Sequence, residues 1–167
     1  ATRFEFARAQ RSRILVPFSS APVTFDGKWT TRDEWADAAE ALGDKAKSYF
    51  RVKHDNAFMY FLADYPADID LSPEDVAWVY IDTLNNGGTS PKSDDYAFQI
   101  YFESPTEPKV FMQRGTGSDW KNATPLHSGM ASNNGLGDPY SSASHMIYEF
   151  KIPNSILPSD TASVGAR

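Results

Sequence analysis

From residue 48 onward, the character of the side chains alternates with a period of two residues, and this alternation constrains the fold more than any other feature of the chain. Residues in a β-strand point alternately to the two faces of a sheet, so this period predicts strands. Six segments show it: 48–54, 57–64, 76–83, 96–103, 109–114 and 145–152. Turn-forming Asn, Asp, Gly, Pro and Ser separate them. We therefore predict an all-β fold, an antiparallel β-sandwich.

One earlier segment has a helical period instead. Thr31 and Glu34 have the spacing of a capping box, and Gly43 provides a stop signal. Between them, apolar side chains recur at helical spacing at Trp35, Ala38, Ala39 and Leu42. The pattern predicts a single short helix that Trp35 anchors to the sandwich. Two short strands are expected before it, at 14–18 and 23–29.

The domain organisation is predicted to be simple. With 167 residues, the chain is long enough for one domain with a core, and no apolar run is long enough for a membrane helix. We expect an N-terminal arm at 1–13, a sandwich module at 14–158 and a tail at 159–167. The stretch 115–144 is rich in Gly, Ser and Asn and is expected to be a long functional loop.

Composition and motifs exclude several classes of function. The net charge of −6 argues against nucleic acid as a partner. The absence of cysteine removes disulfides, thiolate catalysis and cysteine zinc sites. The sequence has no nucleophile elbow, P-loop or H-E-x-x-H motif, so we predict that the protein is not an enzyme. The sequence begins at Ala1 without a charged-then-apolar leader, so we expect that any signal peptide has already been removed.

The aromatic residues, 14% of the chain, suggest a binding surface. Trp78 and Tyr80 fall on the strand face opposite an aliphatic one, and Tyr101 shares its face with a glutamine. Sugar rings stack on Trp and Tyr, while Gln and Arg bind sugar hydroxyls. The predicted ligand-binding residues are Trp120, Arg114, Gln113, Trp78 and Tyr101. The alternative is that the helix, the arm or the long loop covers these rings as part of the core.

Four motifs occur in order along most of the chain. They are the Asp-Gly turn at 25–28 with Trp35, the strand 58–61 ending at Asp64, the hairpin 78–82 with 94–96, and the closing strand 148–153 followed by 156–157. Together they resemble family 9 carbohydrate-binding modules and the related DOMON-like sandwiches. The resemblance implies a jelly-roll-like sandwich that is often secreted, often carries calcium and binds sugars at aromatic residues. Such a module would belong to a larger extracellular protein.

Hard oxygen donors gather on one predicted hairpin. Asp82 ends a strand, Asn85 follows in the loop, and Asp94 and Asp95 open the strand that returns. Calcium takes six to eight oxygen ligands in loose geometry, so these four residues form the predicted calcium site. The alternative is that they are ordinary turn residues. A second acidic turn contains Asp64, Asp68 and Asp70.

Two other functions stay open at this point. DOMON-like relatives imply a haem-binding electron-transfer domain, for which Met112, Met130 or Met146 would pair with His127 or His145. Methionine is also a common core filler, which is the alternative for these residues. The other possibility is an interaction domain of a cell envelope that binds no small ligand.

Overall fold

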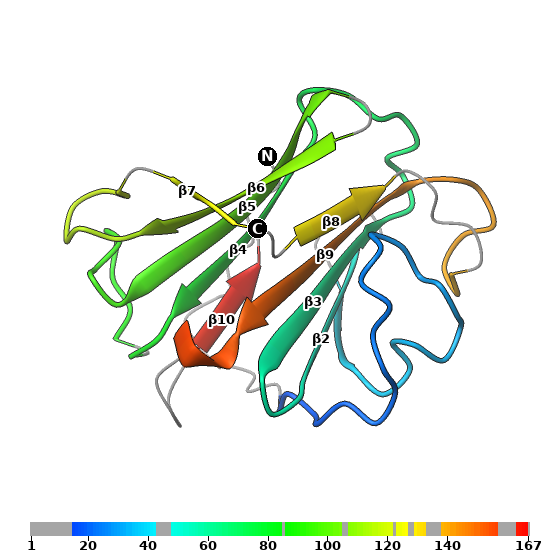
Figure 1. Ribbon diagram of the computed structural model, residues 1–167, viewed down its shortest axis with the longest axis horizontal. Coiled ribbons are helices and arrows are strands. Elements are labelled where there is room, and N and C mark those ends of the chain that lie inside the picture. Colours follow the sequence, from blue (N-terminus) through cyan, green and yellow to red (C-terminus); the bar gives the residue numbers. More distant parts are fainter. Residues whose placement is uncertain are drawn as a thin grey trace.

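A computed structural model describes residues 15–42, 48–84, 86–104, 107–121, 123–126, 129–132, 138–156 and 163–166. These residues form two antiparallel five-stranded sheets that pack against each other (Figure 1), so the all-β prediction is confirmed. All six segments with a two-residue period are strands. Among the described residues there is no helix long and apolar enough to cross a lipid bilayer.

The strands of each sheet come from distant parts of the chain. In spatial order, sheet A contains β1 (Ala39–Leu42), β2 (Tyr49–His54), β3 (Phe58–Tyr65), β9 (Met146–Pro153) and β8 (Gly129–Ser132). Sheet B contains β10 (Ser163–Ala166), β4 (Val76–Asp82), β5 (Asp95–Ser104), β6 (Glu107–Arg114) and β7 (Thr124–Pro125). A single 3₁₀ turn, η1 (Asn154–Ile156), follows β9 in the described part of the chain.

The core lies between the inner faces of the two sheets, as strand alternation predicts. In β9 every second residue from Met146 to Ile152 points inward, and β4 and β5 also point their aliphatic and phenylalanine residues inward. The central side chains are Phe61, Val79, Ile81, Phe98, Ile100, Tyr148, Phe150 and Ile152. Removing this apolar area from water is the main force that holds the sheets together.

A second apolar cluster lies on the outer face of sheet A. Trp29 and Trp35 pack there against Tyr60, Leu62 and Ile147, and all five residues are buried. Figure 1 shows the segment that carries the two tryptophans, in blue to cyan, on the side of β2 and β3 that faces away from sheet B. Sheet A is therefore buried on both faces.

The predicted helix at 31–43 is wrong. Residues 31–38 form successive turns, with bonds such as Glu34 N–H to the Thr31 carbonyl at 3.1 Å, and residues 39–42 form β1. The Glu34 carbonyl instead accepts from Lys53, and the Trp35 carbonyl accepts from Arg51. A helix would need these carbonyls for its own hydrogen bonds, so contacts with β2 override the local helical pattern.

Four other expectations also need correction. The segment 23–29 is not a strand, although its Asp-Gly turn is present, with Gly27 at a φ of 78°. Within 15–18 the described pairing is one bridge, between Phe18 and His54, and residue 14 lies outside the described residues. The predicted loop 115–144 contributes β7 and β8, and the predicted tail contributes β10, which pairs with β4. These strands are short, and their pairing partners are distant in sequence.

We call residues 15–38, which lie on the outer face of sheet A, the covering segment. Although this segment contains no helix, we expect burial of Trp35 to contribute much of the free energy that holds it on the sheet. Its side chain is 0% exposed, so Trp35→Ala should lower the free energy of unfolding by about 3–5 kcal/mol. Chemical denaturation would measure the change. Ile69→Ala is the control, because Ile69 is 58% exposed and its loss should change stability by less than about 0.5 kcal/mol. A Trp35→Ala protein as stable as this control would contradict the assignment.

Candidate functional site

A buried lysine holds the covering segment on sheet A. The Lys53 side chain is 0% exposed, and its Nζ donates to the carbonyls of Ala21 and Glu34 at 2.9 and 2.5 Å. It also pairs with Asp37 Oδ1 at 2.9 Å. Burial alone would raise the pKa of Asp37, but the bonds from Lys53 and from Ala21 and Ser20 hold it well below its usual range. This outer face is closed by polar contacts as well as by the tryptophans.

A buried glutamate fixes the turn of the same segment. Glu149 on β9 accepts from the backbone N–H groups of Asp26 and Gly27 at 3.0 and 2.7 Å through Oε2. Its Oε1 is buried and has no hydrogen-bond partner in the described structure. Burial raises the pKa of Glu149 to about 8, and the nearby charge of Glu34 adds to the shift. The carboxyl group is therefore largely protonated near neutral pH.

The outer face of sheet B is aromatic and half-exposed. Strand register places Trp78 beside Gln99 and Phe111, and Tyr80 in the next row, level with Gln113. The rings of Trp78 and Tyr80 stack with centroids 5.7 Å apart and planes at 15°. Tyr101 and Phe111 stack in the same way, at 5.7 Å and 11°. The rings form a ridge across three adjacent strands.

Trp120 extends this ridge from the loop after β6. Gly115 makes this possible, because a Cβ there would lie 2.0 Å from the Lys92 carbonyl oxygen. The loop therefore packs directly on the segment before β5, and Gly115 pairs with Trp120 in an isolated bridge. The Trp120 ring lies 5.7 Å from Tyr80, tilted by 46°. We call Trp120, Tyr80, Trp78, Phe111 and Tyr101 the aromatic ridge.

The structure brings four of the five predicted ligand-binding residues to one face. Trp78, Tyr101, Gln113 and Trp120 lie on or beside the aromatic ridge, each partly exposed. Arg114 does not, because it alternates with Gln113, and its guanidinium lies over Tyr96 and donates to the Ser93 carbonyl at 2.6 Å. Sequence reasoning missed Phe111, although alternation along β6 puts it on the face of Gln113.

Three of the predicted calcium ligands also lie close together. One carboxylate oxygen from each of Asp82, Asp94 and Asp95 lies within 4.8 Å of the others, because Asp82 and Asp95 are cross-strand partners. Asp95 Oδ1 is a buried atom with no hydrogen-bond partner among the described residues. Burial raises the pKa of Asp95, and the charges of Asp82 and Asp94 raise it further, against bonds from Lys92. This arrangement can accept a hard cation.

The other predicted oxygen ligands are placed differently. Asn85 lies outside the described residues. Its neighbour Asn86 donates its side-chain amide to Asp94 Oδ2 at 2.9 Å. The second acidic turn does not gather its three acids in one place, because Asp64 turns away toward His145. Calcium binding stays a prediction for the Asp82–Asp95 hairpin.

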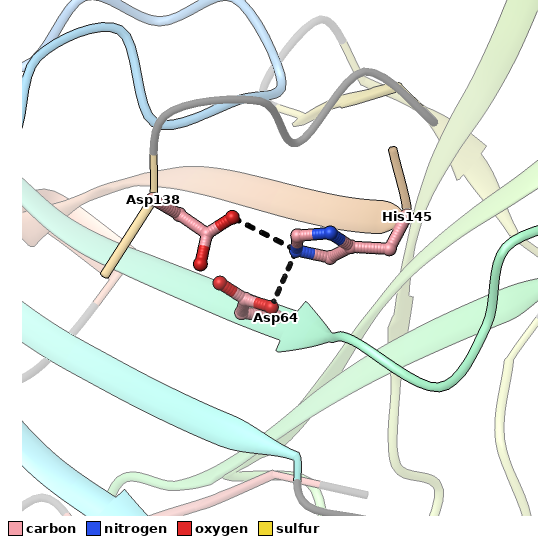
Figure 2. Close-up of side chains that lie close together, drawn as sticks. All are labelled: Asp64, Asp138 and His145. Carbon is pink, nitrogen blue, oxygen red and sulfur yellow. Dashed lines mark ion pairs between the residues drawn. The ribbon is translucent and has the colours of Figure 1, made fainter. Parts of the chain in front are cut away.

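A separate cluster, which sequence reasoning did not find, is wholly buried at the end of β3. Figure 2 shows the carboxylates of Asp64 and Asp138 converging on one ring nitrogen of His145. His145 Nε2 lies 3.0 Å from Asp64 Oδ1 and 3.3 Å from Asp138 Oδ2, and all three side chains are 0% exposed. The other ring nitrogen, Nδ1, lies 2.7 Å from the Ala143 carbonyl oxygen. The sequence did not indicate a role for Asp138, because the long predicted loop that contains it has no periodic pattern of side chains.

Opposing effects set the protonation of this cluster. Burial raises the pKa of Asp64 and the Asp138 charge raises it further, while His145 lowers it. Burial alone would lower the pKa of His145, but Asp64, the Ala143 carbonyl and Asp138 together raise it. The two carboxylates thus favour a positive charge next to them, either a proton on the imidazole or a cation bound beside it.

Among the described residues, the methionines and the histidine named for haem binding have other contacts. Met146 is buried in the core and Met112 packs at its margin. His145 precedes β9, and its side chain is directed at two carboxylates. His127 and the Met130 side chain lie outside the described residues.

Comparisons of the chain with protein-family models, with curated proteins and with solved structures give no significant match. The resemblance to family 9 carbohydrate-binding modules and DOMON-like sandwiches therefore stays a prediction. Functional inference must come from the aromatic ridge and the two metal-compatible clusters themselves.

Glu149 should make the protein less stable as the pH rises. Its folded-state pKa of about 8 lies above its ordinary value of 4.5, so the folded protein binds this proton more tightly than the unfolded chain does. Its stabilising contribution is full below pH 4.5 and is lost between pH 4.5 and about 8. Glu149→Gln should flatten this part of the stability–pH curve, measured by urea unfolding at several pH values. The exposed-site variant Glu74→Gln should leave the curve unchanged, and equal slopes in all three proteins would refute the assignment.

Calcium should stabilise the fold through the Asp82–Asp95 hairpin. At a concentration near 100 times the dissociation constant, binding adds about 2.7 kcal/mol, which corresponds to several degrees in Tm for a domain of this size. Scanning calorimetry with millimolar calcium and then with chelator would measure the shift. Asp82→Asn combined with Asp95→Asn should abolish it. An unchanged Tm in the original protein, or a shift that survives both substitutions, would reject the site.

Proposed function

We propose that this protein is a non-catalytic carbohydrate-binding module and that the aromatic ridge is its binding face. The observation that carries the proposal is the continuous set of half-exposed rings from Trp120 through Tyr80 and Trp78. Large aromatic side chains at this density on an outer sheet face are normally covered or used for binding. The segment 15–38 lies on the outer face of sheet A and not on that of sheet B.

The chemistry of the ridge suits sugars better than it suits apolar ligands. The C–H faces of sugar rings stack on indole and phenol rings, and their hydroxyls need hydrogen-bond partners close by. Gln99 and Gln113 provide such groups within the rows of Trp78 and Tyr80, and Lys109 lies level with Tyr101. A ridge that extends across three adjacent strands fits the side of a polysaccharide chain.

The wider context of the proposal rests on the sequence. The four ordered motifs that resemble family 9 carbohydrate-binding modules support a secreted or cell-surface setting, as one module of a larger protein. Calcium at the Asp82–Asp95 hairpin would have a supporting role, because this hairpin packs against the loop that holds Trp120. The cation would stiffen the end of the ridge without contacting the sugar.

Substitutions on the ridge should weaken sugar binding selectively. Trp78→Ala and Trp120→Ala should each lower affinity roughly tenfold, about 1.4 kcal/mol, from an original Kd in the micromolar to millimolar range. A glycan array would identify a ligand, and calorimetric titration with it would give the affinities. Trp78→Phe keeps a flat ring and should retain more affinity than Trp78→Ala.

Phe18→Ala is the matched control. Phe18 is also an exposed aromatic residue, at 55%, but it packs on His54 beside sheet A. Its loss should leave sugar affinity unchanged. Equal loss in Phe18→Ala and Trp78→Ala would contradict binding on the ridge, and no binding to any glycan would favour the interaction-domain alternative.

A further inference from the structure

The buried cluster of Asp64, Asp138 and His145 has no part in the proposed sugar site. Its three side chains come from the end of β3, from the loop before β9 and from the residue that precedes β9. All belong to sheet A or its connections, whereas the aromatic ridge lies on sheet B. The cluster therefore needs its own explanation.

Four buried atoms in this cluster have no hydrogen-bond partner in the described structure. They are both carboxylate oxygens of Asp64, Asp138 Oδ2 and His145 Nε2. His145 Nε2 is close to both carboxylates, but an N–H on this atom would not be aligned with either oxygen. Buried polar atoms nearly always have a partner, so four such atoms facing one point indicate that something binds between them.

The tautomer of His145 defines what can bind there. The Ala143 carbonyl oxygen only accepts, so the ring proton of a neutral His145 lies on Nδ1. Nε2 then presents a lone pair toward two carboxylates. A divalent cation would remove this repulsion and would also balance the two negative charges. A protonated imidazole balances only one of them, and Arg51, whose charge also acts on Asp64, is already paired with Glu40.

The distances match the coordination of a small transition metal. Ligand atoms in a tetrahedral site about 2.0–2.1 Å from a metal ion lie roughly 3.3 Å from each other. The observed separations from Nε2 are 3.0 and 3.3 Å. The three ligand atoms, one from each residue, all lie within 4.8 Å of one another.

Outer contacts hold the ligands in this orientation. Asp138 Oδ1 accepts from the N–H groups of Tyr140 and Ser141 at 2.6 and 2.9 Å, which leaves Oδ2 directed at the cluster. The bond from His145 Nδ1 to a backbone carbonyl orients the imidazole in the way typical of metal-ligating histidines.

We propose that Asp64, Asp138 and His145 bind one divalent transition-metal ion of the zinc class. His145 supplies Nε2, Asp138 supplies Oδ2, and Asp64 supplies one or both oxygens. An imidazole ligand selects zinc-like ions over calcium and magnesium, so this centre differs in chemistry from the all-oxygen hairpin at Asp82. Because its ligands are buried, the centre is structural: it ties the loop before β9 to the end of β3.

Metal analysis and thermal unfolding test the proposal on the whole chain. Protein stripped with chelator and dialysed against Zn²⁺ should retain one zinc ion per chain by mass spectrometry, and its Tm should rise by several degrees. Calcium should not displace the zinc. Asp138→Asn and His145→Gln should each abolish stoichiometric zinc binding and the zinc-dependent shift.

Asp82→Asn is the matched control, because it removes an acid from the other cluster and should keep full zinc stoichiometry. If the ligand variants fail to fold, Co²⁺ bound to the original protein gives a second readout, since tetrahedral cobalt absorbs strongly in the visible range. Zinc binding that survives both ligand substitutions would overturn the proposal. So would an original protein that binds no zinc and in which ¹⁵N NMR shows both nitrogens of His145 protonated, because the cluster would then be a hydrogen-bonded ion pair.

Discussion

The buried ammonium group of Lys53 determines how the two sheets of this protein differ. It donates to two carbonyls and one carboxylate of the covering segment, and it is itself fully buried. A buried ammonium without these partners would be strongly destabilising, so the segment must lie where it does. The Trp35 ring lies next to the same lysine, 5.4 Å from Nζ. Polar pairing thus fixes the position of the segment, while the tryptophans provide most of the buried apolar area.

Because the outer face of sheet A is covered, the proposed binding surface lies on the outer face of sheet B. Sheet A is buried on both faces and holds the charged interior of the protein, whereas sheet B packs on one face and presents aromatic rings on the other. Rigid strands and a closely packed glycine loop hold those rings at fixed spacings. A binding face of this kind loses little conformational entropy when a ligand binds.

Local periodicity was sufficient to predict much of this architecture. It located six of the strands, and it separated the aliphatic inner face of β4 from the outer face that carries Trp78. Adjacent positions on one hairpin were sufficient to bring Asp82 and Asp95 together. Contacts between distant residues could not be predicted in this way. The Lys53 and Arg51 side chains take carbonyls that a helix at 31–43 would need, and β10 pairs with a strand far from it in sequence.

The buried acids of sheet A show why Asp64 differs from its neighbours. Glu34 and Glu149 also lie in the interior, but each accepts two backbone N–H groups, and the pKa of Glu149 is high enough to keep it largely neutral near pH 7.

Asp64 accepts no backbone N–H within the described structure, and its closest polar neighbours are a second carboxylate and the imidazole that both acids share. One imidazolium can balance one carboxylate but not two. Because burial makes the remaining charge expensive, the cluster needs either an extra proton or a cation. Asp138 is already oriented by two N–H groups on its other oxygen, and the imidazole is fixed by a carbonyl. This orientation leaves Asp138 Oδ2 and His145 Nε2 directed at one point, which is the arrangement that the proposed metal ion requires.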